Sequence, residues 1–135
     1  MKKDLLRIID ANANRSREGL RVCEEVARFV LDDGRLTGQF KNLRHTISRN
    51  IKKFPGVPKT LLESRDSRAD VGRRVLSPSS RKNYKDVFFA NIQRVKESLR
   101  VLEEFSNIFS QSLSNDFAGM RFKVYELEKE VIARL

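Results

Sequence analysis

One fifteen-residue segment of this sequence occurs twice, and this repeat constrains the fold more than any other feature. The segment ANANRSREGLRVCEE at residues 11–25 returns as ANIQRVKESLRVLEE at residues 90–104, with nine of the fifteen positions identical. Both copies carry Asn, Arg and Glu at a spacing of three, which places the three side chains on successive turns of an α-helix. The repeat indicates that the chain consists of two related helical halves.

The polar triplets of the two copies are predicted to share an unusual environment. They are Asn12, Arg15 and Glu18 in the first copy, and Asn91, Arg94 and Glu97 in the second. In each copy the Asn and the Arg fall within an arc of apolar residues, where an unpaired polar group costs free energy. Three explanations remain open: a buried Asn that fixes helix register, an internal Arg–Glu salt bridge, and a polar pocket shared by the two halves. The small residues Gly19 and Ser98 favour the pocket, because they leave space beside the two asparagines.

Apolar residues at helical spacing predict four helices, over about 5–31, 36–53, 80–109 and 114–135. Asp32, Asp33 and Gly34 end the first helix, prolines end the second, and a Ser-Pro-Ser signal at 77–79 precedes the third. No segment is predicted to be a strand.

The returning helices of the two halves also match each other. The matched residues are Phe40, Leu43, Arg44 and Ile47, and Phe117, Met120, Arg121 and Val124. We therefore predict a single all-α domain over 1–135, built as a pseudo-two-fold antiparallel helical bundle of two duplicated hairpins. The hairpins cover about 4–53 and 80–135, and a long functional loop at about 54–79 joins them.

Charge and composition narrow the function classes. The chain has 28 Lys and Arg against 18 Asp and Glu, a net charge of +10, which attracts nucleic acids, acidic membrane surfaces or phosphorylated small molecules. No apolar run approaches the ~20 residues of a membrane span, and the N-terminal segment does not read as a signal peptide. The single cysteine, Cys23, lies on the apolar face, so we expect a core residue in a reducing, cytoplasmic compartment.

The joining loop mixes arginines with carboxylates. Arg65, Asp66, Asp70 and Gly72 lie within eight residues of one another, and a long connection in a compact domain is often functional. Carboxylates in such a loop can bind magnesium or accept a proton from a hydroxyl group, or they can simply neutralise the neighbouring arginines. The sequence contains no glycine-rich phosphate-binding motif and no metal-ligand cluster. The lone His45 is predicted to pack or cap rather than to act as a catalytic base.

Five segments resemble, in order and spacing, one known family. They are DANANRSREGLRVCEEVARFVLDD, KNLRHTI, ESRDSRADVG, ANIQRVKESLRVLEE and MRFKVYELEKE. The resemblance is to the small all-helical domain of thiamine biosynthesis that phosphorylates hydroxymethylpyrimidine phosphate to the diphosphate, a domain often fused ahead of thiamine-phosphate synthase. It implies a kinase that uses ATP and Mg²⁺. The pyrimidine substrate is implied by the resemblance alone.

We assign expected roles to the residues that match this family. The residues expected to be catalytic are Arg65, Asp66 and Asp70, with Asp66 and Asp70 also binding the metal. The residues expected to bind the substrate are Asn12, Arg15, Glu18, Asn91, Arg94 and Glu97. Those expected to bind phosphate are Arg44, His45, Gly72 and Arg121.

The expected partners are a phosphorylated pyrimidine and a nucleotide, with neither nucleic acid nor membrane. Long helices with apolar edges are compatible with a homodimer, and the fusions in the family imply association with thiamine-phosphate synthase. Because the sequence stops at Leu135, we expect it to lack the synthase domain. Two alternatives remain: a basic helical module that binds nucleic acid, and an arginine-lined helical enzyme for another phosphorylated or carboxylated metabolite.

Overall fold

The all-α prediction is confirmed by the computed structural model, which describes residues 3–54, 62, 65–74 and 80–135. The helical elements are α1 (Lys3–Glu25), a π-helical turn (Val26–Val30), α2 (Gly34–Ile51), a 3₁₀ turn η2 (Val71–Arg74), α4 (Tyr84–Phe109) and α5 (Gln111–Ile132). No strand occurs within the described residues.

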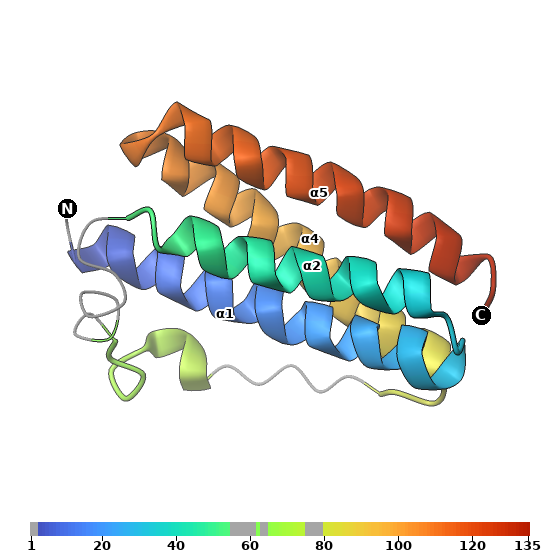
Figure 1. Cartoon of the computed structure of the whole chain (residues 1–135). Coiled ribbons are helices and arrows are strands. Elements are labelled where there is room, and N and C mark those ends of the chain that lie inside the picture. Colours follow the sequence, from blue (N-terminus) through green and yellow to red (C-terminus); the bar gives the residue numbers. More distant parts are fainter. Residues whose placement is uncertain (1–2, 55–61, 63–64, 75–79) are drawn as a thin grey trace.

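The four long helices form two antiparallel hairpins that pack against each other (Figure 1). α1 and α4 lie along each other, α2 packs on α1, and α5 packs on α4, whereas α2 and α5 meet over a shorter stretch. The segment 65–74 lies alongside α1 on the side away from α2 (Figure 1). This arrangement is the predicted helical bundle of two hairpins.

Contacts between α1 and α4 show the predicted pseudo-two-fold relation. The hydroxyl oxygens of Ser16 and Ser98 lie 2.6 Å apart, and a Cβ added at Gly19 would lie 2.7 Å from Cγ2 of Val95. The repeat maps Ser16 onto Val95 and Gly19 onto Ser98. The two contacts are therefore equivalent, and the pseudo-two-fold axis passes between them.

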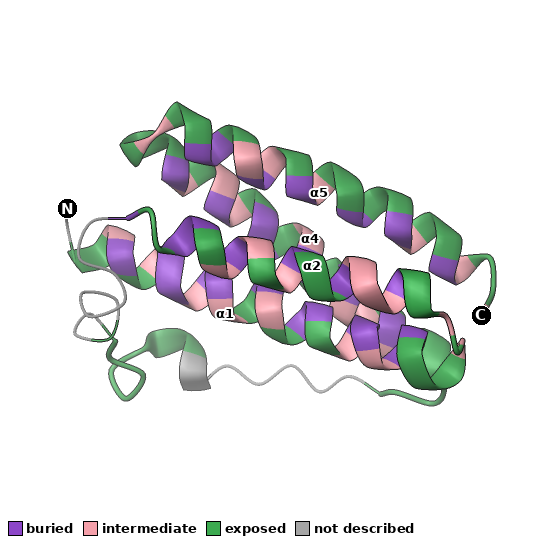
Figure 2. Cartoon of the chain, in the orientation of Figure 1, coloured by how far each residue is buried: buried purple, intermediate pink, exposed green. Residues whose placement is uncertain are grey.

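The buried residues lie on the inward faces of the helices (Figure 2). The largest fully buried aromatic residues are Phe40, Phe54, Phe88 and Phe117. Cys23 is also fully buried, and burial raises the pKa of its thiol, as expected for a core residue.

Local hydrogen bonds set the helix boundaries, and several boundaries differ from the prediction; α5, for example, begins at Gln111 rather than near residue 114. α4 begins at Tyr84 rather than near residue 80, because the side chain of Asn83 accepts a hydrogen bond from the amide of Asp86 at 2.8 Å. The predicted Ser-Pro-Ser cap lies outside the described residues. The first helix changes to a π-helical turn at Val26, where the amide of Leu31 donates to the Val26 carbonyl at 3.0 Å.

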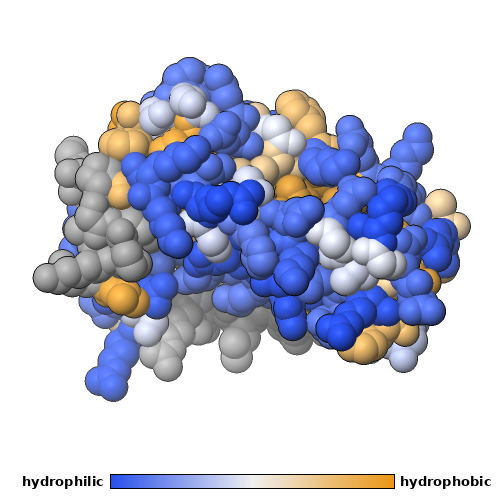
Figure 3. Space-filling view, viewed as in Figure 1, coloured by the Kyte–Doolittle hydropathy of each residue, from blue (hydrophilic) through white to orange (hydrophobic). Residues whose placement is uncertain are grey.

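The face seen in Figure 3 is mostly hydrophilic, with scattered hydrophobic side chains. Among the described residues, no helix combines the length and apolar character that a membrane span requires.

Candidate functional site

Two matching arginines meet at a hollow of about 280 Å³ between α1 and α4. Its lining residues are Asn12, Arg15, Arg94, Glu97, Ser98 and Val101. Arg15 and Arg94 hold equivalent positions in the repeat, so the antiparallel packing of α1 on α4 brings them to one place. We call this the arginine hollow.

The charges of these two arginines are not neutralised by ion pairs. Arg15 donates to Oδ1 of Asn12 over a long 3.4 Å, and no ion pair joins Arg15 or Arg94 to a carboxylate within the described residues. Glu97 accepts a hydrogen bond from Gln93 at 3.1 Å instead. Two arginines that line one hollow without carboxylate partners favour an anion with several oxygens, such as a phosphate.

The expectation that both arginines lie on the apolar face is wrong. Arg15 and Arg94 are exposed, as are Glu18 and Glu97, whereas Asn12 is buried. The arginines stand at the edge of the apolar stripe, where a long side chain carries its charged end into solvent. The arginine hollow is therefore open to solvent on its charged side.

The two asparagines do not meet in one pocket. Each donates its side-chain amide to the carbonyl four residues earlier, Asn12 to Ile8 and Asn91 to Val87, both at 2.8 Å. The backbone carbonyl oxygen of Asn91 lies beside Gly19. Gly19 is seven residues from Asn12, which corresponds to about 10 Å along the helix. Antiparallel packing separates them, and only Asn12 lines the arginine hollow.

Arg44 and Arg121 are each paired with a carboxylate of their own hairpin. Nε of Arg44 donates to Glu24, and Nε of Arg121 donates to Glu103, both at 2.8 Å. These two glutamates were not predicted to pair with the arginines, although they hold matching positions in the repeat. Because both arginines are neutralised within the bundle, we leave them out of the proposed phosphate site.

A second hollow, of about 370 Å³, lies between α1 and the segment 65–74. Its lining residues are Arg7, Asp10, Ala11, Asn14, Arg65, Asp66, Ser67 and Asp70. We call it the loop hollow. Asn14 lines the loop hollow and the next residue, Arg15, lines the arginine hollow, so the two hollows open on adjacent sides of α1.

The carboxylates of the loop have local partners that shape its backbone. Oδ1 of Asp66 accepts from the amide of Ala69 at 3.2 Å, and Oδ1 of Asp70 accepts from the amide of Gly72 at 2.9 Å. Each carboxylate therefore keeps Oδ2 for a ligand. Gly72 is held in this loop turn, and His45 is exposed on α2 and lines neither hollow.

Asp66 and Asp70 fit a magnesium ion that is bound together with a nucleotide. Three or more side chains of the metal-binding types do not converge anywhere in the described part of the chain. Magnesium does not require such a cluster, since it commonly binds one or two carboxylates, several waters and substrate phosphates. Two carboxylates lining one solvent-accessible hollow supply that donor set.

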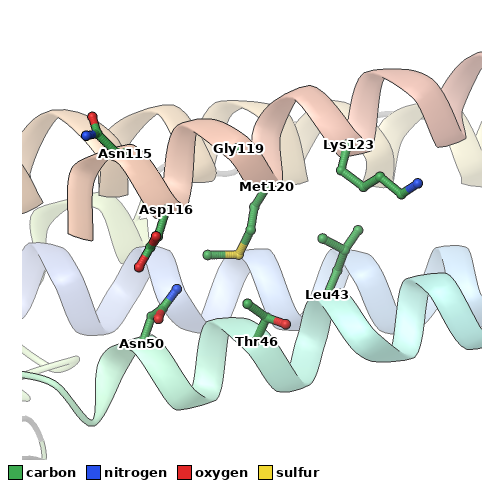
Figure 4. A pocket seen from close by; sticks show the side chains of 8 residues that line it. All are labelled: Leu43, Thr46, Asn50, Asn115, Asp116, Gly119, Met120 and Lys123. Carbon is green, nitrogen blue, oxygen red and sulfur yellow. The ribbon is translucent and has the colours of Figure 1, made fainter. Parts of the chain in front are cut away.

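A groove of about 450 Å³ between α2 and α5 lies outside the predicted site (Figure 4). Its lining residues are Leu43, Thr46, Asn50, Asn115, Asp116, Gly119, Met120 and Lys123. Met120 and Leu43 extend into the space between the two helices, while Asp116 and Asn50 face each other at one end (Figure 4). None of these residues was predicted to bind substrate or metal.

The fold and the two hollows define a small helical protein with an arginine-lined hollow and a loop that carries both arginines and carboxylates. Residues 7–130 match the ThiD2 family, and the chain belongs to this family.

Curated relatives of the chain share one name. The chain is 37% identical over 128 residues to the thiamine-phosphate synthase of Nostoc punctiforme, covering 93% of this chain and 35% of that protein. It is 38% identical over 127 residues to the enzyme of that name from Thermosynechococcus vestitus, covering 93% and 34%. The corresponding match in Rhodopirellula baltica is 36% identical over 131 residues, covering 96% and 34%. The chain thus spans about a third of the length of these relatives, and no solved structure matches it.

Proposed function

We propose that this chain is a kinase of thiamine biosynthesis that transfers a phosphoryl group from ATP to hydroxymethylpyrimidine phosphate. Membership of the ThiD2 family and the name of the relatives support the pathway. The observation that supports a phosphorylated substrate is that Arg15 and Arg94 line one hollow and that neither has a carboxylate partner among the described residues.

The arginine hollow offers complementary groups to such a substrate. Arg15 and Arg94 would hold the phosphate of the pyrimidine, because guanidinium groups bind phosphate oxygens through paired N–H donors. Oδ1 of Asn12, which lines the same hollow, would bind a polar group on the ring. The nucleotide would lie in the neighbouring loop hollow.

The reaction needs positioning and charge neutralisation rather than a base. An oxygen of the substrate phosphate attacks the γ-phosphorus of ATP, a new P–O bond forms, and the bond to the β-phosphate oxygen breaks to release ADP. A phosphate monoester has a second pKa of about 6, so the attacking oxygen is already deprotonated at neutral pH. The absence of a histidine among the residues lining either hollow is therefore no obstacle.

Asp66 and Asp70 would hold the magnesium ion that accompanies the nucleotide. Bound there, Mg²⁺ would neutralise charge on the phosphates during transfer. Because these carboxylates belong to a loop that covers one side of the hollow, the loop would also limit the access of water and thus wasteful hydrolysis.

The test is to incubate the protein with Mg²⁺, ATP and hydroxymethylpyrimidine phosphate and to identify the product by mass and by ³¹P spectroscopy. We expect the diphosphate and an equal amount of ADP, and a rate of diphosphate formation about a hundredfold lower from the Arg94→Gln variant at low substrate concentration. Failure to form the diphosphate with any nucleoside triphosphate and divalent metal would refute the proposal. Salt-dependent binding to RNA in its place would support the nucleic-acid alternative.

A further inference from the structure

A buried carboxylate of α1 holds the loop against the bundle. Asp10 is only 6% exposed, and a buried carboxylate is costly unless it is paired and hydrogen-bonded. Its two oxygens accept from Nε and Nη2 of Arg65, at 2.7 and 2.8 Å. Arg65 lies 55 positions further along the chain, so this pair joins the loop to the first helix.

The second half of the molecule serves as an internal comparison. The repeat places Phe89 of α4 at the position equivalent to Asp10, and Phe89 is a partly exposed apolar residue. The carboxylate is therefore not part of the duplicated scaffold. It occurs only in the helix against which the loop lies.

A second cation stands close to this pair. Arg17 donates to Asn14 at 2.6 Å and to Ser48 of α2 at 3.2 Å. Burial lowers the pKa of Arg17, while Asp10 raises it and Arg65 lowers it. Asp10 thus interacts electrostatically with two guanidinium groups, one fixed in the bundle and one supplied by the loop.

We propose that Asp10 is a positioning residue, which binds Arg65 and thereby fixes where Asp66 and Asp70 stand in the loop hollow. Asp66 follows Arg65 directly, and its side chain closes the turn 66–69 that leads into Asp70, which closes a second turn to Gly72. Anchoring Arg65 therefore places both carboxylates. The consequence for catalysis rests on the proposed kinase function, whereas the anchor itself does not.

Limited proteolysis with trypsin can measure how often the contact between Asp10 and Arg65 opens. Trypsin cleaves after an arginine only when the arginine side chain enters the specificity pocket of the protease. Cleavage after Arg65 requires the side chain to leave Asp10, whereas Arg68 is exposed and makes no ion pair within the described residues. The ratio of initial cleavage rates after Arg65 and after Arg68 thus reports how often the anchor opens.

We expect Asp10→Asn to raise this ratio about tenfold, the order lost with a charge-assisted bidentate bond. Asp116→Asn is the matched control, because it removes the carboxylate of another ion pair, with Lys53, and should leave the ratio unchanged. Asp10→Glu keeps the charge and should restore most of the protection. If Asp10→Asn does not fold, Asp10→Ser removes the same charge with a smaller side chain. If the cleavage ratio is unchanged in a folded variant that lacks the charge of Asp10, the proposal that Asp10 anchors the loop is wrong.

The kinetic readout separates positioning from simple stability. Asp10→Asn should lower kcat about tenfold while KM for the pyrimidine phosphate stays within about twofold, since the arginine hollow is untouched. A raised cleavage ratio with unchanged kcat would overturn the positioning role. An inactive wild-type protein would refute the proposed function, and the cleavage ratio would still decide whether Asp10 anchors the loop.

Discussion

The two hairpins share one sequence repeat, yet within the described part of the chain only the first has a loop segment along its flank. Both keep the Asn-to-carbonyl bond four residues back, and both keep a Glu–Arg pair between their two helices. They differ where the loop lies: Asp10 stands in the first hairpin and Phe89 in the second. The shared features therefore belong to the scaffold, and the differences belong to the loop.

A third kind of feature is formed by equivalent residues of both hairpins that meet near the pseudo-two-fold axis. Arg15 and Arg94 are duplicated residues, but the axis brings them into one hollow, so neither hairpin alone has this site. The proposed phosphate site therefore uses an equivalent arginine from each hairpin, whereas the carboxylates come from the loop alone. The following variants test that division.

The largest effect is expected from Asp66→Asn. The Asn side-chain oxygen can still accept from the amide of Ala69, so the loop keeps its turn while it loses a proposed metal ligand. We expect kcat to fall by about a thousandfold or more, measured by formation of the diphosphate at saturating Mg²⁺. Near wild-type turnover in this variant would show that the loop does not contribute Asp66 to catalysis, and the functional difference between the two hairpins would be lost.

Substitution of the paired arginines should have the next largest effect. Arg15→Gln and Arg94→Gln should each lower kcat/KM about a hundredfold, because each removes a charged donor to the phosphate. The control is Arg100→Gln, which breaks a surface pair with Glu104. A loss of kcat/KM in only one of the two variants would show that one arginine, and not the pair, binds the phosphate.

The two asparagines should respond differently to the same change. Asn12→Leu should lower kcat/KM about tenfold, because Asn12 lines the arginine hollow and loses a polar contact to the ring. Asn91→Leu should change it less than about twofold, since Asn91 lies beside Gly19 and away from the hollow. Equal losses in the two variants would show that the asparagines act together.

The sequence predicted the scaffold well, because the repeat and the apolar spacing are local signals. Phe40 and Phe117 were matched in the two halves, and both are fully buried. The surface pairs Arg21–Glu25 and Arg100–Glu104 are equally local, since a pair four residues apart depends only on helical spacing.

The candidate site could be predicted only in part, because it depends on how distant segments meet. The meeting of Arg15 and Arg94 follows from the antiparallel packing of α1 on α4, and the same packing separates Asn12 from Asn91. Asp10 gave no local signal at all, since its partner Arg65 lies 55 positions away. Its difference from Phe89 within the repeat was the one available indication.

The equivalent Glu–Arg pairs should contribute unequally to the free energy of unfolding. Glu24 is 5% exposed in its side chain against 15% for Glu103, and Arg121 has a second partner in the hydroxyl of Tyr125. Glu24→Gln should therefore cost about 3 kcal/mol and Glu103→Gln about 1 kcal/mol, measured by urea unfolding. Adding Arg44→Met to Glu24→Gln should recover part of the loss. Equal losses of unfolding free energy in the two variants would show that the two Glu–Arg pairs stabilise the bundle equally.

The smallest effect concerns the N-caps of the two returning helices, which are equivalent in position but not in chemistry. Asp33 accepts from the amide of Leu36 at 2.9 Å, and Ser110 accepts from that of Leu113 at 3.3 Å. The hydrogen bond from Leu36, followed by that from Arg134, lowers the pKa of Asp33, whereas a serine cap does not titrate in this range.

Because the pKa of Asp33 is lower in the folded state, its stabilising effect is present above the unfolded-state value of about 4 and is lost as the pH falls through the folded-state value. Asp33→Ser copies the cap of the second hairpin. We expect wild type to melt at a higher temperature than Asp33→Ser at neutral pH, and this difference in Tm to disappear in acid. A difference that stays constant between neutral pH and pH 2 would show that the charge of Asp33 contributes nothing, and that the two caps differ in geometry alone.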